Sequence, residues 1–284
     1  MARSKLLRAI SVFLIIFTIY YLTFHYLSIS LSSRPTKAKS PVLYVITPTY
    51  NRKTQMADLV RLKQTLLIVA NCVWIVIEDS DKTSAIVHNY IKDFPRLIHL
   101  SEATSKDWTF RGTHQRNRGL KELYLMHLMG DITSYGAIYF ADDDNTYDAS
   151  FLDQIRWVKR VAVFNVGLIS GQLFEGPDVR AGRVVGWKTA WPDDRAFCID
   201  MAGFVVNLNF FLRRGPIDSF LFRKTKKGHQ ESAFLQNLGI KVDQLENFPG
   251  PNFINVWHTR TEQPEPLGEL ATYERRNDLY WPFE

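Results

Sequence analysis

The sequence has few of the features that would fix its architecture covalently or by repetition. Its 284 residues include only two cysteines, Cys72 and Cys198, which excludes a multi-disulfide scaffold. Cys72 precedes an apolar segment, where a buried free thiol is the commoner outcome. There is no Asn-x-Ser/Thr acceptor, no internal repeat and no block rich in lysine and arginine. N-glycosylation therefore gives no clue to the compartment, and nucleic acid is not expected as a partner.

What remains is the composition of a basic globular protein. Hydrophobic residues make up 46% of the chain, charged residues 23%, and the net charge is +6. This length and composition suffice for one large domain or two closely packed halves. A basic balance favours anionic partners such as nucleotides, uronic or sulfated sugars, or acidic membranes. Without a nucleic-acid motif, we expect a small anionic substrate.

A long apolar run near the amino terminus predicts a membrane anchor. Residues 9–31 are nearly uncharged, with His25 as the one interruption, and about 20 such residues span a bilayer. Three basic residues precede the run: Arg3, Lys5 and Arg8. They place the tail 1–8 in the cytosol. A cleaved signal peptide is the alternative, but its apolar region is usually shorter. We expect an uncleaved type II signal anchor, a short stem at 32–41 and a lumenal domain.

Strands and helices alternate in the first part of that domain. We predict strands at 42–47, 73–77, 97–100 and 136–140, and helices at 55–69, 83–94 and 113–129. This alternation indicates an α/β fold with a mostly parallel sheet flanked by helices. The strand ends then meet at one edge, where Pro48–Tyr50, Asp79 and Asp142–Asp144 line a crevice of the kind that binds ligands.

The three consecutive aspartates that follow the apolar segment 136–140 are the strongest local sign of a site. Asp142, Asp143 and Asp144 repel one another unless a cation or hydrogen-bond donors neutralise them. Carboxylate oxygens suit Mg²⁺ or Mn²⁺, which fill their other positions with water and substrate phosphates. A solvated acidic turn is the plainer alternative, because loops often carry acids.

The pattern changes after Asn145. We predict a helix at 151–161 and short strands within 163–170 and 184–189, separated by glycine-rich turns. From Pro264 onward the chain is polar and proline-rich, and we expect it to wrap the surface.

Several short motifs follow one another between residues 47 and 262. They are Thr47–Tyr50, Glu78–Asp79, Arg111 with Gln115–Asn117, Tyr139–Tyr147, Phe174–Pro177, Asp200–Phe204, Gly228–Ser232 and Val256–Glu262. Each is weak alone. Together and in this order they resemble the β-1,3-glucuronosyltransferases, an inverting family with a GT-A-like nucleotide-diphospho-sugar transferase fold.

The resemblance implies a donor site for UDP-glucuronate. Tyr50 and Asp79 would hold the uracil by stacking and hydrogen bonding. Asp142 and Asp143 would contact the uridine and its ribose, and Asp144 would bind a Mn²⁺ ion that bridges the diphosphate.

Four cationic residues complete the implied donor site: Arg111, Arg116, His258 and Arg260. They would surround the diphosphate and the sugar. Guanidinium groups suit both phosphate and carboxylate, and glucuronate brings a carboxylate as well as two phosphates.

Glu231 is the candidate catalytic base. Inversion by direct displacement needs a carboxylate that takes the proton from the acceptor hydroxyl, supplied from a different segment than the metal site. We predict that Glu231 lies in the first turn of a helix at 230–238, where the helix dipole would favour its ionised form. Simple capping of that helix is the alternative role.

The resemblance also implies an acceptor site formed by Glu175, Trp191, Arg195 and Asp200. Aromatic rings contact the C–H faces of sugars, and carboxylates bind their hydroxyls. In having a tryptophan at position 191, the chain resembles the relatives that act on the proteoglycan linkage region. Packing in the core is the other role open to Trp191.

The resemblance thus implies transfer of glucuronic acid to the 3-hydroxyl of a terminal galactose on a glycan. Residues 42–147 would form the UDP-sugar-binding half, and residues 148–284 the acceptor-binding half with a carboxy-terminal tail. Family members exchange such tails across a dimer, so a homodimer is expected. The location implied is the Golgi membrane, with the catalytic domain in the lumen.

Two other readings stay open. Asp142-x-Asp144-x-Thr146 after an apolar strand also fits the first motif of haloacid-dehalogenase-type phosphatases, in which the first aspartate is a nucleophile. That motif usually opens its domain, whereas here other strands come first. The chain could also be a catalytically silent, membrane-anchored glycan-binding protein. The presence of both Asp144 and Glu231 argues against this.

Overall fold

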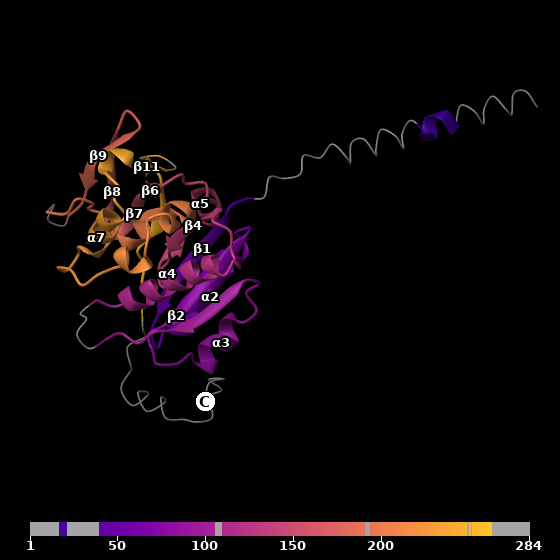
Figure 1. Cartoon of the computed structure of the whole chain (residues 1–284), viewed down its shortest axis with the longest axis horizontal. Coiled ribbons are helices and arrows are strands. Elements are labelled where there is room, and N and C mark those ends of the chain that lie inside the picture. The colour runs from indigo at the N-terminus through magenta and orange to yellow at the C-terminus, as the bar shows by residue number, and fades with distance from the viewer. Residues whose placement is uncertain are drawn as a thin grey trace, which may run out of the picture. The chain divides into compact units, whose positions relative to one another are not determined.

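Seven strands pair side by side in the order β11-β6-β10-β4-β1-β2-β3. Figure 1 labels β11, β6, β4, β1 and β2 of this sheet. They are β1 (Val42–Thr49), β2 (Cys72–Glu78), β3 (Leu97–Ser101), β4 (Gly136–Phe140), β6 (Val161–Val163), β10 (Phe204–Asn207) and β11 (Glu246–Asn247). The computed structural model describes residues 17–21, 40–105, 110–190, 194–248, 250 and 252–262. The parallel pairing of β1 with β2 and β4, and of β2 with β3, confirms the parallel arrangement predicted for these four strands. The sheet as a whole is mixed, because β10 runs antiparallel to both of its neighbours.

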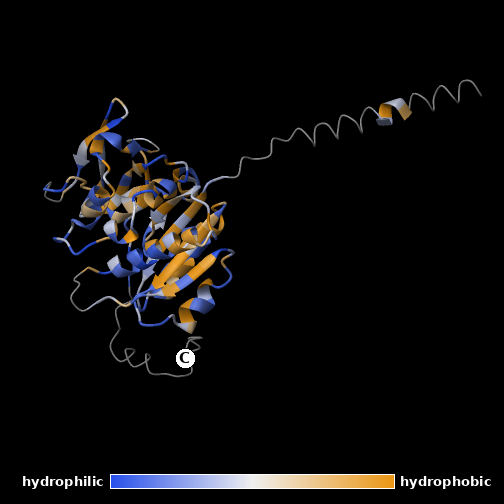
Figure 2. Ribbon diagram, viewed as in Figure 1, coloured by the Kyte–Doolittle hydropathy of each residue, from blue (hydrophilic) through white to orange (hydrophobic). Residues whose placement is uncertain are grey.

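Helices cover both faces of this sheet. One face packs against α2 (Gln55–Leu67), α3 (Ala85–Ile91) and α5 (Ala149–Ile155). The other packs against α4 (Thr113–Leu128), α6 (Leu208–Leu212) and α7 (Gln230–Asn237). Along β1, alternate side chains pack into one core or the other, because successive side chains of a strand point to opposite faces of the sheet. Figure 2 shows the central strands as mostly hydrophobic and many surface loops as hydrophilic.

A second, five-stranded sheet has the order β5-β12-β7-β8-β9. It consists of β5 (Thr146–Tyr147), β7 (Asn165–Ile169), β8 (Gln172–Arg180), β9 (Arg183–Lys188) and β12 (Ile254–Trp257). Strand β12 lies between β5 and β7. This pairing carries the residues after Trp257 to the strand that directly follows the three aspartates.

The two predicted halves share one sheet. Strand β10 runs antiparallel between β4 and β6, so strands from beyond residue 148 complete the sheet begun at Val42. Residues 41–284 accordingly form one compact unit, which contains both hydrophobic cores. Three short 3₁₀ helices, η1 (Met201–Gly203), η2 (Ile217–Ser219) and η3 (Val242–Gln244), lie in the second half.

The predicted helix at 151–161 is wrong in its extent. Helix α5 ends at Ile155, and Val161 already belongs to β6. The apolar residues 161–163 pair with β10, and this long-range pairing overrides the local helical spacing. Both cysteines are buried, and Cys72 is a free thiol, as expected.

Part of the sequence-based prediction falls outside the described residues. This applies to the tail 1–8, to most of the predicted span 9–31 and stem 32–41, and to the chain beyond Glu262. Residues 17–21 are helical, and residues 1–40 form a unit of their own. Within the described ranges, no helix combines the length and apolar character needed to cross a membrane.

Candidate active site

The carboxyl ends of β1 and β4 hold the first part of the site. Strands β1 and β4 are in parallel register, which brings Thr49 to the aspartate run. Thr49 Oγ1 donates a 2.6 Å hydrogen bond to Asp143 Oδ2. A small cavity of about 150 Å³ opens at this edge. Seven of the predicted residues line it: Tyr50, Asp79, Arg111, Arg116, Asp142, Asp143 and Asp144. The structure therefore brings together residues expected from topology, Tyr50, Asp79 and Asp142–Asp144, and two implied by the resemblance, Arg111 and Arg116.

The three aspartates have different surroundings. Asp142 forms an ion pair with Arg116. Asp143 is buried and forms a 2.8 Å ion pair with Arg52. Burial raises the pKa of Asp143 to about 6, although Arg52 and Thr49 act in the opposite direction.

Asp144 is the aspartate suited to a ligand from outside the chain. Within the described part of the chain its carboxylate has no ion pair and accepts no hydrogen bond, whereas its backbone carbonyl accepts two. Burial, and then the charge of Asp142, raise the pKa of Asp144. A cation at this carboxylate would remove both penalties.

The donor set at this point is too small for a metal held by protein alone. Among the described residues, no group of three or more His, Cys, Asp or Glu side chains could hold a metal ion. One carboxylate oxygen set beside open space fits a hard divalent cation that takes its other ligands from water and phosphates. The residues present therefore fit a metal that binds together with a nucleotide.

Arg116 reaches Asp142 because a glycine precedes its helix. Gly112 caps α4 with φ of 80°, a left-handed conformation that favours glycine. A Cβ at this position would lie 2.5 Å from Arg116 Nη1. A side chain at residue 112 would displace the guanidinium group that pairs with Asp142.

Tyr50 and Asp79 both lie in the small cavity, but neither is without contacts. The guanidinium carbons of Arg52 and Arg111 lie 4.8 and 4.7 Å from the centre of the Tyr50 ring. The Asp79 carboxylate accepts hydrogen bonds from the backbone N and the hydroxyl of Thr104, at 2.7 and 2.8 Å. Arg111 thus contacts the aromatic ring on which a base would stack.

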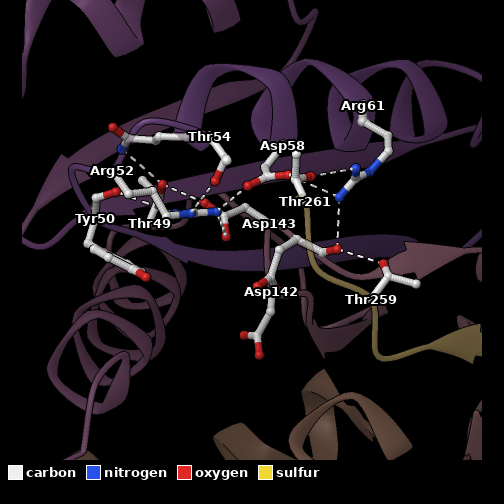
Figure 3. A network of polar contacts seen from close by, with 12 residues as sticks. Thr49, Tyr50, Arg52, Thr54, Asp58, Arg61, Asp142, Asp143, Thr259 and Thr261 are labelled. Atoms are coloured by element: carbon white, nitrogen blue, oxygen red, sulfur yellow. Dashed lines mark hydrogen bonds and ion pairs between the residues drawn. The ribbon is translucent and has the colours of Figure 1, made fainter. Parts of the chain in front are cut away.

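A partly buried network behind the aspartates was not predicted from the sequence (Figure 3). Its centre is Asp58 of α2, which is fully buried. Asp58 forms ion pairs with Arg52 at 2.8 Å and with Arg61 at 3.1 Å. It also accepts a hydrogen bond from Thr261.

The same network reaches the backbone of the aspartate run. Arg61 Nη2 and Thr259 Oγ1 donate to the carbonyl of Asp144 at 2.8 and 2.7 Å. The spacing of Asp58 and Arg61 on one helix was a readable signal, because residues three apart lie on one face. No such sequence signal predicted the contact of Asp58 with Thr261, which lies 203 positions away in the chain.

A larger cavity of about 820 Å³ lies beside the first. Six predicted residues line it: Glu175, Arg195, Asp200, Glu231, His258 and Arg260. Glu175 is buried and accepts a hydrogen bond from the Ala190 backbone at 3.0 Å. Trp191 lies outside the described residues.

A third cavity, of about 350 Å³, joins these two. Arg111, Arg116 and Asp142 line it and also the small cavity, while Asp200 and Glu231 line it and also the large one. The three cavities therefore form one continuous cleft, with the aspartate run at one end and Glu231 in its large part.

Glu231 lies in the first turn of α7, as predicted. Its ionisation differs from the prediction. Burial, and then the charge of Asp200, raise the pKa of Glu231 to about 7, against the opposing effect of Arg116 and Arg195. The helix N-terminus does not outweigh these effects. A carboxylate with a pKa near neutrality can accept a proton and release it again.

Comparison with known proteins places these residues in a family context. The profile of glycosyltransferase family 43 matches residues 62–262. The chain is 41% identical over 243 residues to galactosylgalactosylxylosylprotein 3-beta-glucuronosyltransferase 2 of Rattus norvegicus, covering 81% of this chain and 73% of that protein. Against galactosylgalactosylxylosylprotein 3-beta-glucuronosyltransferase 3 of Homo sapiens, the identity is 37% over 253 residues, with coverages of 81% and 74%.

Proposed function

The chain belongs to glycosyltransferase family 43, and on that premise we propose that it transfers glucuronic acid from UDP-glucuronate to a galactose. The names of the relatives describe a protein-linked acceptor with two galactoses and a xylose. The proposed acceptor is therefore the terminal galactose of the proteoglycan linkage region. The observation that carries the proposal is the continuous cleft, which has the open Asp144 carboxylate at one end and Glu231 in its large part.

The donor binds in the narrow part of the cleft. Tyr50 and Asp79 hold the uracil, and Asp142 and Asp143 hold the uridine and ribose. The Arg111 guanidinium lies against the Tyr50 ring, on which the uracil would stack. When the donor binds, Arg111 therefore either leaves the ring or stacks with the base.

Four cationic side chains along the cleft neutralise the rest of the donor: Arg111, Arg116, His258 and Arg260. Arg116 already pairs with Asp142, so it is preorganised rather than free to move. His258 and Arg260 line the large cavity together with Glu231, which supports a role for them at the sugar and its carboxylate.

Asp144 is the proposed ligand of Mn²⁺. The ion would supply positive charge that neutralises the diphosphate as its bond to the sugar breaks. The open carboxylate of Asp144 and the lack of a three-ligand site among the described residues favour a metal that arrives with the nucleotide.

Glu231 acts as the base. It takes the proton of the acceptor 3-hydroxyl while that oxygen attacks the anomeric carbon, and the bond to the diphosphate breaks on the opposite face. The configuration of the sugar is therefore inverted. Glu175, Arg195 and Asp200 line the cavity around Glu231 and bind the acceptor together with Trp191.

Family membership also bears on architecture and location. A sheet with helices on both faces and a site at its carboxyl edge agrees with a GT-A-like fold. We further propose a homodimer, and a type II anchor at residues 9–31 that holds the domain in the Golgi lumen. Protease added outside sealed microsomes should then spare the domain, and its digestion would reverse the orientation.

The central experiment measures UDP release from UDP-glucuronate with a digalactoside acceptor, a lactosamine acceptor, or none. Release that depends on the digalactoside supports the proposal. Hydrolysis of a general phosphatase substrate with no UDP-glucuronate turnover would favour the phosphatase reading instead. Binding of glycan without turnover would favour a silent binding protein.

A further inference from the structure

Six large hydrophobic side chains gather at the edge of the seven-stranded sheet that lies opposite the cleft. They are Leu67, Ile68, Leu128, Met129, Tyr135 and Trp157, here called the amino-edge patch. All are exposed, with Ile68 at 76% and Met129 at 65%. The rest of the described domain beyond residue 40 has six other exposed large hydrophobic residues.

Topology places these residues together. Each belongs to the end of a helix, or to the connection that leads from it to the next strand: α2 to β2, α4 to β4, and α5 to β6. Strands β2, β1, β4 and β6 run in the same direction and begin at the same edge. With neighbouring strands about 4.8 Å apart, the connections to β2 and β6 lie within about 20 Å of one another.

The start of β1 lies in the middle of this patch. All three connections contact it through hydrogen bonds. Val42 N donates to the carbonyl of Tyr135 at 3.2 Å, and Leu43 N donates to the carbonyl of Asn71 at 3.1 Å. Arg156 Nη1 donates to the carbonyl of Pro41 at 3.0 Å. The stem therefore joins the domain where exposed apolar side chains are concentrated.

The charge and aromatic content of this edge suit a lipid surface. Arg96, Lys159 and Arg160 are exposed beside the patch, where their charged groups can pair with the phosphates that phospholipid head groups carry. Two acids lie at the same edge. Asp131 is exposed, and the Glu246 carboxylate accepts hydrogen bonds from the backbone N of Lys159 and of Arg160. Tyrosine and tryptophan are the residues enriched at membrane–water interfaces, and Trp157 is 55% exposed.

We propose that the amino-edge patch rests on the surface of the lipid bilayer and orients the catalytic domain. In its biological setting this inference rests on the proposed anchor at 9–31. The ten residues 32–41 of the stem reach at most about 35 Å when fully extended, so the edge where β1 begins stays near the bilayer. The cleft lies at the far end of β1, about 26 Å away for eight residues of strand, and opens away from the membrane toward acceptor proteins.

The test uses residues 41–284, which form a compact unit with both cores. We would measure flotation of this fragment with phosphatidylcholine vesicles, with and without phosphatidylserine. The test variant combines Ile68→Ser, Met129→Ser and Trp157→Ser. The control is Leu173→Ser, which removes a side chain that is 80% exposed on β8, outside the patch.

The unchanged fragment and the control should float with vesicles, and the triple variant should lose binding about tenfold or more. Thermal unfolding and turnover of a soluble acceptor should be alike in all three. Equal flotation of the triple variant, or no flotation of the unchanged fragment, would overturn the proposal. A dimer that depends on the patch without vesicle binding would assign this surface to a second copy of the chain. Since the fragment lacks residues 1–40 and flotation needs no turnover, failure here is distinct from failure of the anchor or of the transferase activity.

Discussion

Arg61 donates a 2.8 Å hydrogen bond to the backbone carbonyl of Asp144, 83 positions later in the chain. Thr259 donates to the same carbonyl, and Asp58 holds Arg61 from the other side. The position of the proposed metal ligand is therefore set by its backbone, which leaves its carboxylate open to the cleft. The side chains that hold it come from α2 and from the segment after β12.

Asp58→Asn tests whether this network positions the site. The substitution keeps the size of the side chain but removes the buried charge between Arg52 and Arg61, and breaking such a pair costs about 3–5 kcal/mol. The free energy of unfolding and the affinity for Mn²⁺ with UDP should both fall, measured by denaturant titration and calorimetry. Asp93→Asn removes an exposed carboxylate paired with Lys63 and should change neither. Unaltered metal and UDP affinity in Asp58→Asn would limit Asp58 to a structural role.

Asp144→Asn should lose the metal-dependent part of nucleotide binding, because a neutral amide is a poorer ligand for a hard cation. Activity of the unchanged protein should vanish in chelator and return best with Mn²⁺. Asp131→Asn, at an exposed carboxylate remote from the cleft, is the control. Full activity of Asp144→Asn would remove this residue from the metal site.

Glu231→Gln separates chemistry from binding. The amide keeps the shape of the side chain but cannot accept the proton, and loss of a general base typically costs about 10²–10⁴ in rate. The aspartate run and its network come from other segments, so UDP affinity should change by less than about tenfold. Turnover near normal would return Glu231 to helix capping, and loss of UDP binding would indicate a structural role.

The pKa of Glu231, about 7, predicts the pH dependence of the reaction. The base must be ionised, so kcat/KM should fall about tenfold per pH unit below pH 7 and level off above it. This acidic limb should be absent from the residual activity of Glu231→Gln. A limb that persists unchanged in the variant would assign the titration to another group.

The raised pKa of Glu231 also predicts that ionisation of this side chain, which catalysis requires, lowers the stability of the folded protein. The folded-state pKa lies above the ordinary value of 4.5, so between these values the folded protein binds more protons than the unfolded chain. Stability from this group is present below pH 4.5 and is lost as the pH rises through 7. In the absence of ligands, Glu231→Gln should therefore unfold at a higher temperature than the unchanged protein at pH 8. An equal or lower unfolding temperature would contradict the burial of the charge.

Donor choice tests the cationic residues of the large cavity. If Arg260 binds the uronate carboxylate, kcat/KM should be higher for UDP-glucuronate than for UDP-glucose by about tenfold or more. A charge-assisted hydrogen bond of this kind contributes about 1.5–3 kcal/mol. Arg260→Ala should narrow this ratio. Equal use of both donors by the unchanged protein would leave these cations to the diphosphate alone.

The sequence by itself determined the first half of the fold and much of the cleft. The alternation of apolar segments from Val42 to Phe140 predicted β1 to β4 and the helices between them, because local periodicity is set by which faces of each element must be buried. Parallel strands with right-handed crossovers then required Tyr50, Asp79 and the aspartate run to share one edge. The motifs also identified the family.

Only the tertiary structure decided how distant segments complete the site. The insertion of β12 between β5 and β7 carries His258 to the aspartate run, and the antiparallel β10 joins the second half to the first sheet. It also decided that burial raises the pKa of Glu231 to about 7, where the sequence predicted a helix dipole that favours the ionised form. Strand pairing across such separations depends on packing, and a pKa depends on the charges and burial that packing creates. Neither the long-range strand pairing nor the pKa can be predicted from the periodicity of a local segment.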